Sequence, residues 1–358
     1  MGESSIELLL QILNEAKDND ASDIHLAPSS NVMIRVDGDM IPLEKYFLKP
    51  YDIEGILNGM LKEKQLHELE ENGELDFAYS VSGLGRVRVN VFRQRGTFAM
   101  SMRILPFVIP DARSLNIPES VIDLCKVKKG LILVTGPSGS GKSTTIAALL
   151  REIAQNSIKN IITIEDPIEY LHQHGKSIVL QREIGVDTSC YSRAIKAALR
   201  QDPDVIFVGE MRDLETISSA IAAAENGRLV FSTLHNNNVV DAIDRLIEVY
   251  PVHQQQQIRV MLASVIKGVV AQQLLPIKNS KGREVAFEVM LNNMEISKLI
   301  KIGKTNQIIN IMQESKKDGM RLMDDSIYDL YMKGIINGES AISYSSDKTL
   351  MSERVQLF

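Results

Sequence analysis

The sequence predicts an α/β protein whose central domain is a mostly parallel sheet wrapped by helices, preceded by an α+β domain and followed by a helical region. Two observations support this prediction. Short apolar runs alternate with stretches of helical periodicity over residues 119–270, as parallel strands joined by helices require. Before residue 106 the pattern is instead an opening helix followed by alternating strands. The chain has 358 residues and 44% hydrophobic content, which suffices for two or three domains with sizeable cores.

The first domain is predicted over residues 1–105. Apolar side chains at helical spacing indicate a helix close to the N-terminus, and residues 51–71 also look helical. Residues 33–41 predict a hairpin that turns at Asp37-Gly38. Two more strands are predicted over residues 86–91 and 98–104, because apolar and polar side chains alternate in both.

These last two strands predict a second hairpin that turns near Arg95-Gly96. The expected register pairs Val87, Val89 and Val91 with Met102, Met100 and Phe98. It places Arg88 and Arg103 on one polar face, since side chains alternate between the faces of a sheet. Such a face either is simply solvated or supplies an arginine to a phosphate bound by a neighbouring subunit.

A linker or hinge is predicted over residues 106–118, which contain three prolines and show no periodicity. The sheet domain follows over 119–270, with apolar runs at residues 131–134, 161–164, 205–208 and 229–231. From about residue 252 the pattern becomes helical, and residues 271–340 are expected to form a helical region. The polar, Ser-rich residues 341–358 are expected to be loosely ordered.

Residues 136–144 match the phosphate-binding P-loop at every fixed position and stand between a predicted strand and a predicted helix. Glycines let backbone N–H groups turn toward anionic oxygens, and the helix amino end adds positive partial charge. Lys142 is expected to reach the terminal phosphates and Ser143 to bind Mg²⁺. The nucleotide-binding residues are therefore Gly136, Pro137, Ser138, Gly139, Ser140, Gly141, Lys142, Ser143 and Thr144.

Three polar side chains follow the predicted strands within four residues: Glu165, Glu210 and His235. The carboxyl ends of parallel strands share one edge of the sheet, so these side chains should gather near the P-loop. Glu210 suits a general base or a water-positioning role, and Glu165 is the second candidate carboxylate. Together with Ser143 they form the expected magnesium set. His235 either senses the terminal phosphate or is a structural hydrogen-bonding group.

The composition and net charge of the chain limit the classes of protein to which it can belong. A net charge of −6 argues against a general nucleic-acid binder, which is usually basic. The two cysteines, Cys125 and Cys190, lie far apart, form no CxxC pair and are expected to be small core residues. This usage fits a reducing cytoplasm. No secretory signal or membrane-spanning run is recognisable, so work at a membrane would need a partner that holds the protein there.

Several longer segments resemble the type II secretion and type IV pilus ATPase superfamily. Residues 199–213 are similar to its Walker B signature at every position. Residues 163–170 resemble its Asp box and 232–238 its His box; 22–26 with 34–38, and 85–92 with 103–106, resemble its N-terminal domain. The resemblance covers about residues 5–340. It is strongest to the retraction ATPases, because the N-terminal region is short, the tetracysteine zinc element is missing and residues 283–290 resemble the lead-in to the retraction motif.

The resemblance implies a RecA-like P-loop ATPase domain with a PAS-like N-terminal domain, assembled into a homohexamer. It implies ATP and Mg²⁺ as cofactors and Glu210, Glu165, His235, Arg88 and Arg103 as catalytic residues. The expected partners are further copies of the chain, an integral-membrane pilus platform protein and other pilus ATPases, but no specific nucleic acid. The ring would dock at the inner face of the cytoplasmic membrane.

One departure from the family pattern concerns the retraction helix. Over residues 295–302 its two arginines are replaced by Ser297 and Lys301, and its acid by Ile302. The first interpretation is an ATP-driven motor of pilus retraction. The alternatives are an assembly or secretion ATPase of the same superfamily, and an accessory ring subunit that binds ATP without acting as a motor. A DNA motor fits poorly with an acidic chain.

Overall fold

The computed structural model describes residues 2–36, 38–81, 84–104, 108–280 and 282–356. They form two compact units: Met1–Val108 with Glu169–Leu171, and Ile109–Ile168 with His172–Phe358. Each unit has its own hydrophobic core.

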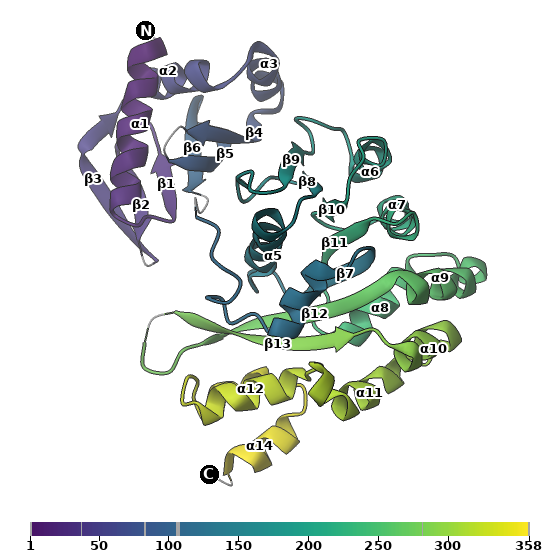
Figure 1. Ribbon diagram of the computed structural model, residues 1–358. Coiled ribbons are helices and arrows are strands. Elements are labelled where there is room, and N and C mark those ends of the chain that lie inside the picture. The colour runs from purple at the N-terminus through teal and green to yellow at the C-terminus, as the bar shows by residue number, and fades with distance from the viewer. Residues whose placement is uncertain (1, 37, 82–83, 105–107, 281, 357–358) are drawn as a thin grey trace. The chain divides into compact units, whose positions relative to one another are not determined.

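The first unit is a six-stranded antiparallel sheet in the order β3-β2-β1-β6-β5-β4. Helices α1 and α2 cover one face of it, with Leu9, Ile12 and Ile56 fully buried against the strands (Figure 1). The elements are α1 (Gly2–Asp18), β1 (Asp23–Leu26), β2 (Ser30–Val36), β3 (Asp39–Leu48), α2 (Pro50–Met60), α3 (Glu63–Asn72), β4 (Glu74–Val81), β5 (Gly85–Gln94) and β6 (Thr97–Ile104).

The opening helix and the first hairpin are confirmed, with Val36 opposite Asp39; Asp37 of the expected turn lies outside the described residues. The helix expected over 51–71 is two helices, because the chain is extended at Leu61, whose side chain is buried in the core. The turn at Arg95-Gly96 is confirmed, with both residues at positive φ.

The expected register of β5 and β6 is wrong by two residues. Val89 lies opposite Met102 and Val91 opposite Met100. The two-residue turn makes Gln94 and Thr97 the closing pair, and this fixes every pair behind it. Arg88 and Arg103 do share a face, and they lie directly opposite each other.

The second unit is a seven-stranded sheet in the order β13-β12-β7-β11-β10-β8-β9, parallel except for the edge pair β12–β13. Its first elements are α4 (Glu119–Ile122), η1 (Asp123–Lys126), β7 (Gly130–Thr135), α5 (Lys142–Asn156), β8 (Asn160–Glu165), β9 (Ile178–Glu183), α6 (Tyr191–Ala198), β10 (Val205–Val208), α7 (Leu214–Glu225), β11 (Leu229–Leu234), α8 (Val239–Glu248) and α9 (Val252–Val265). The last are β12 (Ile266–Pro276), β13 (Arg283–Leu291), α10 (Met294–Ile302), η2 (Thr305–Gln307), α11 (Ile308–Glu314), η3 (Lys316–Asp318), α12 (Met323–Met332), α13 (Gly338–Tyr344) and α14 (Lys348–Gln356).

All four apolar runs that predicted strands form central parallel strands of this sheet. They are buried on both faces. Leu131 and Leu133 pack toward α6–α9, whereas Ile132 and Val134 pack toward α5 and the segment before α4. This two-sided burial explains why the runs are continuously apolar rather than alternating.

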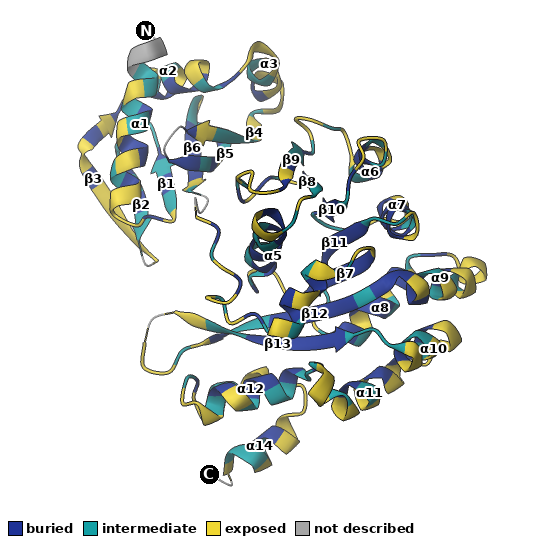
Figure 2. Ribbon diagram, in the orientation of Figure 1, coloured by how far each residue is buried: buried dark blue, intermediate teal, exposed yellow. Residues whose placement is uncertain are grey.

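Two long strands, β12 and β13, occupy part of the region expected to be helical. Figure 2 shows both as largely buried, and the helices proper resume only at α10. An apolar strand that is buried on both sides has no period that separates it from a buried helix, so periodicity alone could not find β12 and β13.

The C-terminal segment is not loosely ordered as expected. Residues 341–356 lie largely in α13 and α14. Met351 is 1% exposed, and the Arg354 guanidinium lies 4.1 Å from the centroid of the Tyr328 ring of α12. A few apolar and cationic anchors therefore hold a segment whose overall composition is polar.

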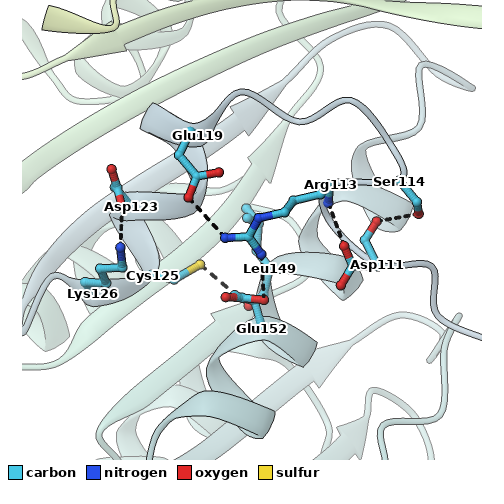
Figure 3. A network of polar contacts seen from close by, with 9 residues as sticks. All are labelled: Asp111, Arg113, Ser114, Glu119, Asp123, Cys125, Lys126, Leu149 and Glu152. Carbon is cyan, nitrogen blue, oxygen red and sulfur yellow. Dashed lines mark hydrogen bonds and ion pairs between the residues drawn. The ribbon is translucent and has the colours of Figure 1, made fainter.

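The predicted linker is packed over most of its length. Within it, Ala112 and Ile117 are buried in the core of the second unit. Arg113 lies 3.0 Å from Glu119 and 3.8 Å from Glu152 of α5 (Figure 3). Residues 106–107 lie outside the described part of the chain. Residues 109–118 are thus fixed on the helix that follows the P-loop.

Candidate functional site

The loop between β7 and α5 has the backbone that the P-loop pattern requires. Gly136, Gly139 and Gly141 have φ of 149°, 75° and 88°, which favour glycine. A Cβ on Gly136 would also lie 2.4 Å from the carbonyl oxygen of Gln272. Conformation and space together therefore exclude a side chain at Gly136. Of the other predicted loop residues, Ser140 is buried, while Ser143 and Thr144 lie half-buried in the first turn of α5.

Lys142 is 7% exposed, and its ammonium lies inside the loop. Nζ donates to the carbonyl oxygens of Gly136, at 2.7 Å, and Pro137, at 3.0 Å. It also lies 3.4 Å from Nδ1 of His235. A buried cation that is held by backbone carbonyls is positioned to receive an anion at the loop.

Glu210 and His235 meet beside this lysine. Nε2 of His235 lies 3.1 Å from Oε1 of Glu210, and Nε of Arg212 lies 2.6 Å from the same oxygen. Although burial opposes ionisation, the hydrogen bond and charge of Arg212, with His235, hold the pKa of Glu210 below its ordinary value. A carboxylate that stays ionised at neutral pH can orient a water molecule or accept its proton.

Glu165 ends β8 and is also buried. Its Oε1 accepts hydrogen bonds from Thr163 Oγ1, at 2.5 Å, and Gln181 Nε2, at 3.1 Å. Next to it, the hydrogen bond from Gly209 N to Ile164 O, at 2.8 Å, joins the end of β10 to β8. Lys142, Glu210 and His235 thus form one chain of contacts, and Glu165 stands at the adjacent strand end.

Two residues of this site were not assigned from the sequence. Arg212 stands two positions after Glu210 within the Walker B-like segment, and that spacing was the available signal. Tyr191 begins α6, and burial together with Asp166, Glu210 and Glu165 raises the pKa of its phenol. Nothing in its sequence context points to this placement.

A cavity of about 270 Å³ adjoins the P-loop. Ser140 and Thr144 line it on the loop side, and residues 114–116 belong to its wall. Leu274 and Phe287, from β12 and β13, supply apolar surface. The side-chain amide of Gln272 donates to Ser140 O at 2.6 Å and so ties β12 to the loop.

The two predicted arginines lie in the first unit. Arg88 and Arg103 are both exposed, and Nε of Arg103 donates to Oδ1 of Asp23 at 2.8 Å. Partial burial opposes ionisation of Asp23. Hydrogen bonds from Ser22 and Arg103 nevertheless hold the pKa of its carboxyl group below the ordinary value. Arg103 is therefore already paired within its own unit, whereas Arg88 has an exposed guanidinium.

The cysteines differ from each other. Cys125 is partly buried and packs against the core near α5, and burial raises the pKa of its thiol to about 12, whereas Cys190 is exposed and was wrongly expected in a core. Across the described ranges, no group of three or more His, Cys, Asp or Glu side chains could hold a metal ion. The same ranges contain no helix that is both long and apolar enough to cross a membrane.

Comparison with known proteins gives consistent matches. Residues 116–342 match the family model "Type II/IV secretion system protein". Two relatives from Pseudomonas aeruginosa are the "Type IV pilus ATPase PilU", 38% identical over 95% of this chain and 88% of its own, and the "Type IV pilus retractation ATPase PilT", 39% identical over 93% and 96%. A crystal structure of "the Pilus Retraction Motor PilT and Bound ADP" has a TM-score of 0.89 and 46% identity, and covers 95% of this chain and 98% of its own.

Proposed function

Because the chain belongs to the type II/IV secretion system protein family, we propose that it is an ATP-hydrolysing motor that drives retraction of type IV pili. The observation that carries this proposal is the contact chain from Lys142 through His235 to Glu210, built directly on the P-loop. The similarity to PilT spans both units rather than the ATPase core alone, which supports the same role for the whole chain.

In the proposed reaction the P-loop binds the phosphates of ATP and Lys142 neutralises their charge. Mg²⁺ would supply Lewis-acid stabilisation of the phosphate oxygens. Ser143, Glu165 and Glu210 are the oxygen ligands available to it. The apolar cavity beside Ser140 and Thr144 would take the base.

Glu210 acts on the attacking water in this scheme, because it is ionised and fixed by two cationic or hydrogen-bonding neighbours. His235 bridges Glu210 and Lys142, so it links the water-activating group to the phosphate-binding loop. Arg88 is the better of the two predicted arginines for a phosphate of a neighbouring subunit, because Arg103 is held by Asp23.

We further propose a homohexameric ring that acts from the cytoplasm on an integral-membrane pilus platform protein. Its conformational cycle would change the angle between the two units. Pilins would then return to the membrane as the ring turns over ATP.

Helix α10, which departs from the retraction motif, is compatible with this motor. Its altered residues nevertheless favour a second candidate function, that of an accessory ring subunit. Ser297, in place of an arginine, donates to the carbonyl oxygen of Ala263 at 3.1 Å, so this position now docks α10 on α9. Ile302, in place of an acid, is 53% exposed. A changed outer face is what an accessory ring subunit, which modulates a partner motor, would present.

The test is to image labelled pili in cells that lack the gene and to measure ATPase activity of the purified protein. Extra, static pili in the deletion strain and an active enzyme are the expected results. Cells without pili would mean an assembly motor and would refute the proposal. Complementation with Glu210→Gln, beside Glu225→Gln on the exposed end of α7, separates the two candidates: an accessory subunit tolerates Glu210→Gln, and a motor does not.

A further inference from the structure

Glu288 is a buried carboxylate at the amino end of a helix. It lies in β13, opposite Ala271 of β12, and is 6% exposed. Its Oε1 accepts a hydrogen bond from the backbone N–H of Val239, the first residue of α8, at 3.2 Å. Negative charge is favourable there, because the free N–H groups of a helix give its amino end a positive partial charge.

The surroundings of Glu288 resist its ionisation. Burial is the main cause that raises its pKa to about 7, and the hydrogen bond from Val239 lowers it again in part. Two charged groups face Glu288, namely Asp241 of α8 and Asp324 of α12. Both are acids, and their negative charges raise the pKa of Glu288 further. The carboxyl group therefore changes charge in the neutral range, where an ordinary glutamate is fully ionised.

The helix that Glu288 holds begins where the His235 loop ends. Asn238 is the N-cap of α8, three residues after His235. On its other side the loop is held at Asn236, whose carbonyl oxygen accepts a hydrogen bond from Thr135 Oγ1 at 2.6 Å. Two fixed points thus position the loop: one at the end of β7, beside the P-loop, and one at Glu288.

We propose that Glu288 is a positioning residue for ATP hydrolysis: its carboxylate holds the amino end of α8, and thereby His235 against Glu210 and Lys142, and proton uptake weakens this hold. The inference rests on the proposed function, since it assumes that Glu210 and His235 serve hydrolysis. Glu288 then makes the turnover rate of the motor sensitive to pH near neutrality.

The test compares kcat and KM for ATP of the full-length protein and Glu288→Gln from pH 5.5 to 8.5. A charge-assisted hydrogen bond is roughly twice as strong as a neutral one, which corresponds to a rate factor of about five. The ratio of wild-type to variant kcat should be about one at pH 5.5 and rise to about five at pH 8.5. KM should not change, because Glu288 acts through the His235 loop.

Two further variants separate this role from a merely structural one. Glu314 is an exposed carboxylate of α11, and Glu314→Gln should leave the pH profile of kcat unchanged. Asp324→Asn removes one of the two facing acids and should move the rise in kcat to lower pH. A rise that stays in place in Asp324→Asn would refute the proposal.

A stability measurement tests the titration without enzymatic activity. Between about pH 4.5 and 7 the native protein keeps a proton at Glu288 that the unfolded chain releases. The free energy of unfolding of the wild type, relative to Glu288→Gln, should therefore fall as pH rises through this window. A difference that does not change with pH would refute the titration. A wild type without ATPase activity would refute the proposed function, whereas an active one with a pH-independent kcat ratio would refute the role of Glu288 alone.

Discussion

Gly209 occupies the position between β10 and Glu210, and its substitution by alanine tests how closely the two strand ends are packed. A Cβ there would lie 2.9 Å from Oη of Tyr191, 3.2 Å from the carbonyl oxygen of Ile164 and 3.3 Å from Cα of Glu165. Two of these three atoms are backbone of β8, which cannot rotate away. The hydrogen bond from Gly209 N to Ile164 O would have to lengthen instead.

The expected cost follows from this geometry. Overpacking by one methyl group in a closely packed region costs about 1–3 kcal/mol. A shift of a few tenths of an ångström between β10 and β8 would also move Glu210 away from Glu165. Since misplacement by 1 Å costs on the order of 100-fold in rate, we expect about a tenfold loss of kcat in Gly209→Ala.

The assay is urea unfolding together with ATPase kinetics of Gly209→Ala, Tyr191→Phe and the double variant. Removal of the Tyr191 hydroxyl removes one of the three close contacts, so the double variant should recover part of the lost stability. Wild-type stability and kcat in Gly209→Ala would refute the reasoning, because they would mean that β8 and β10 separate without cost.

Three further results are expected. Ser143→Ala should raise the Mg²⁺ concentration that gives half-maximal ATPase activity, and an unchanged Mg²⁺ dependence would exclude its hydroxyl as a ligand. Cys190 should react with a maleimide in the native protein at pH 7, whereas Cys125, whose thiol is buried with a raised pKa, should react only after unfolding; mass spectrometry of labelled peptides decides this. Thr135→Val removes the hydrogen bond to Asn236 and should lower kcat several-fold without changing stability by more than about 2 kcal/mol, and loss of ATP binding instead would contradict a role confined to the His235 loop.

The placement of the candidate site residues at one edge of the sheet could be predicted because its signals are short and contiguous. Glu165 is the last residue of β8, Glu210 stands two residues after β10 and His235 directly follows β11, and parallel strands bring such ends to one edge. The strands β12 and β13 could not be predicted in the same way, since their apolar runs carry no decisive period. The register of β5 with β6 also depended on a detail, the conformation of one two-residue turn.

By itself the sequence determined the phosphate-binding loop, the parallel core and the identity of the strand-end residues. Each depends on a few neighbouring residues, because backbone sterics and hydrophobic periodicity act over short stretches of the chain. Only the tertiary structure decided that Glu288 holds α8, that Thr135 holds Asn236, and that Arg354 anchors the C-terminal helices. These contacts join residues far apart in the chain. The partner of a buried polar group depends on which surfaces the folded layers bring together. A local sequence pattern therefore does not predict that partner.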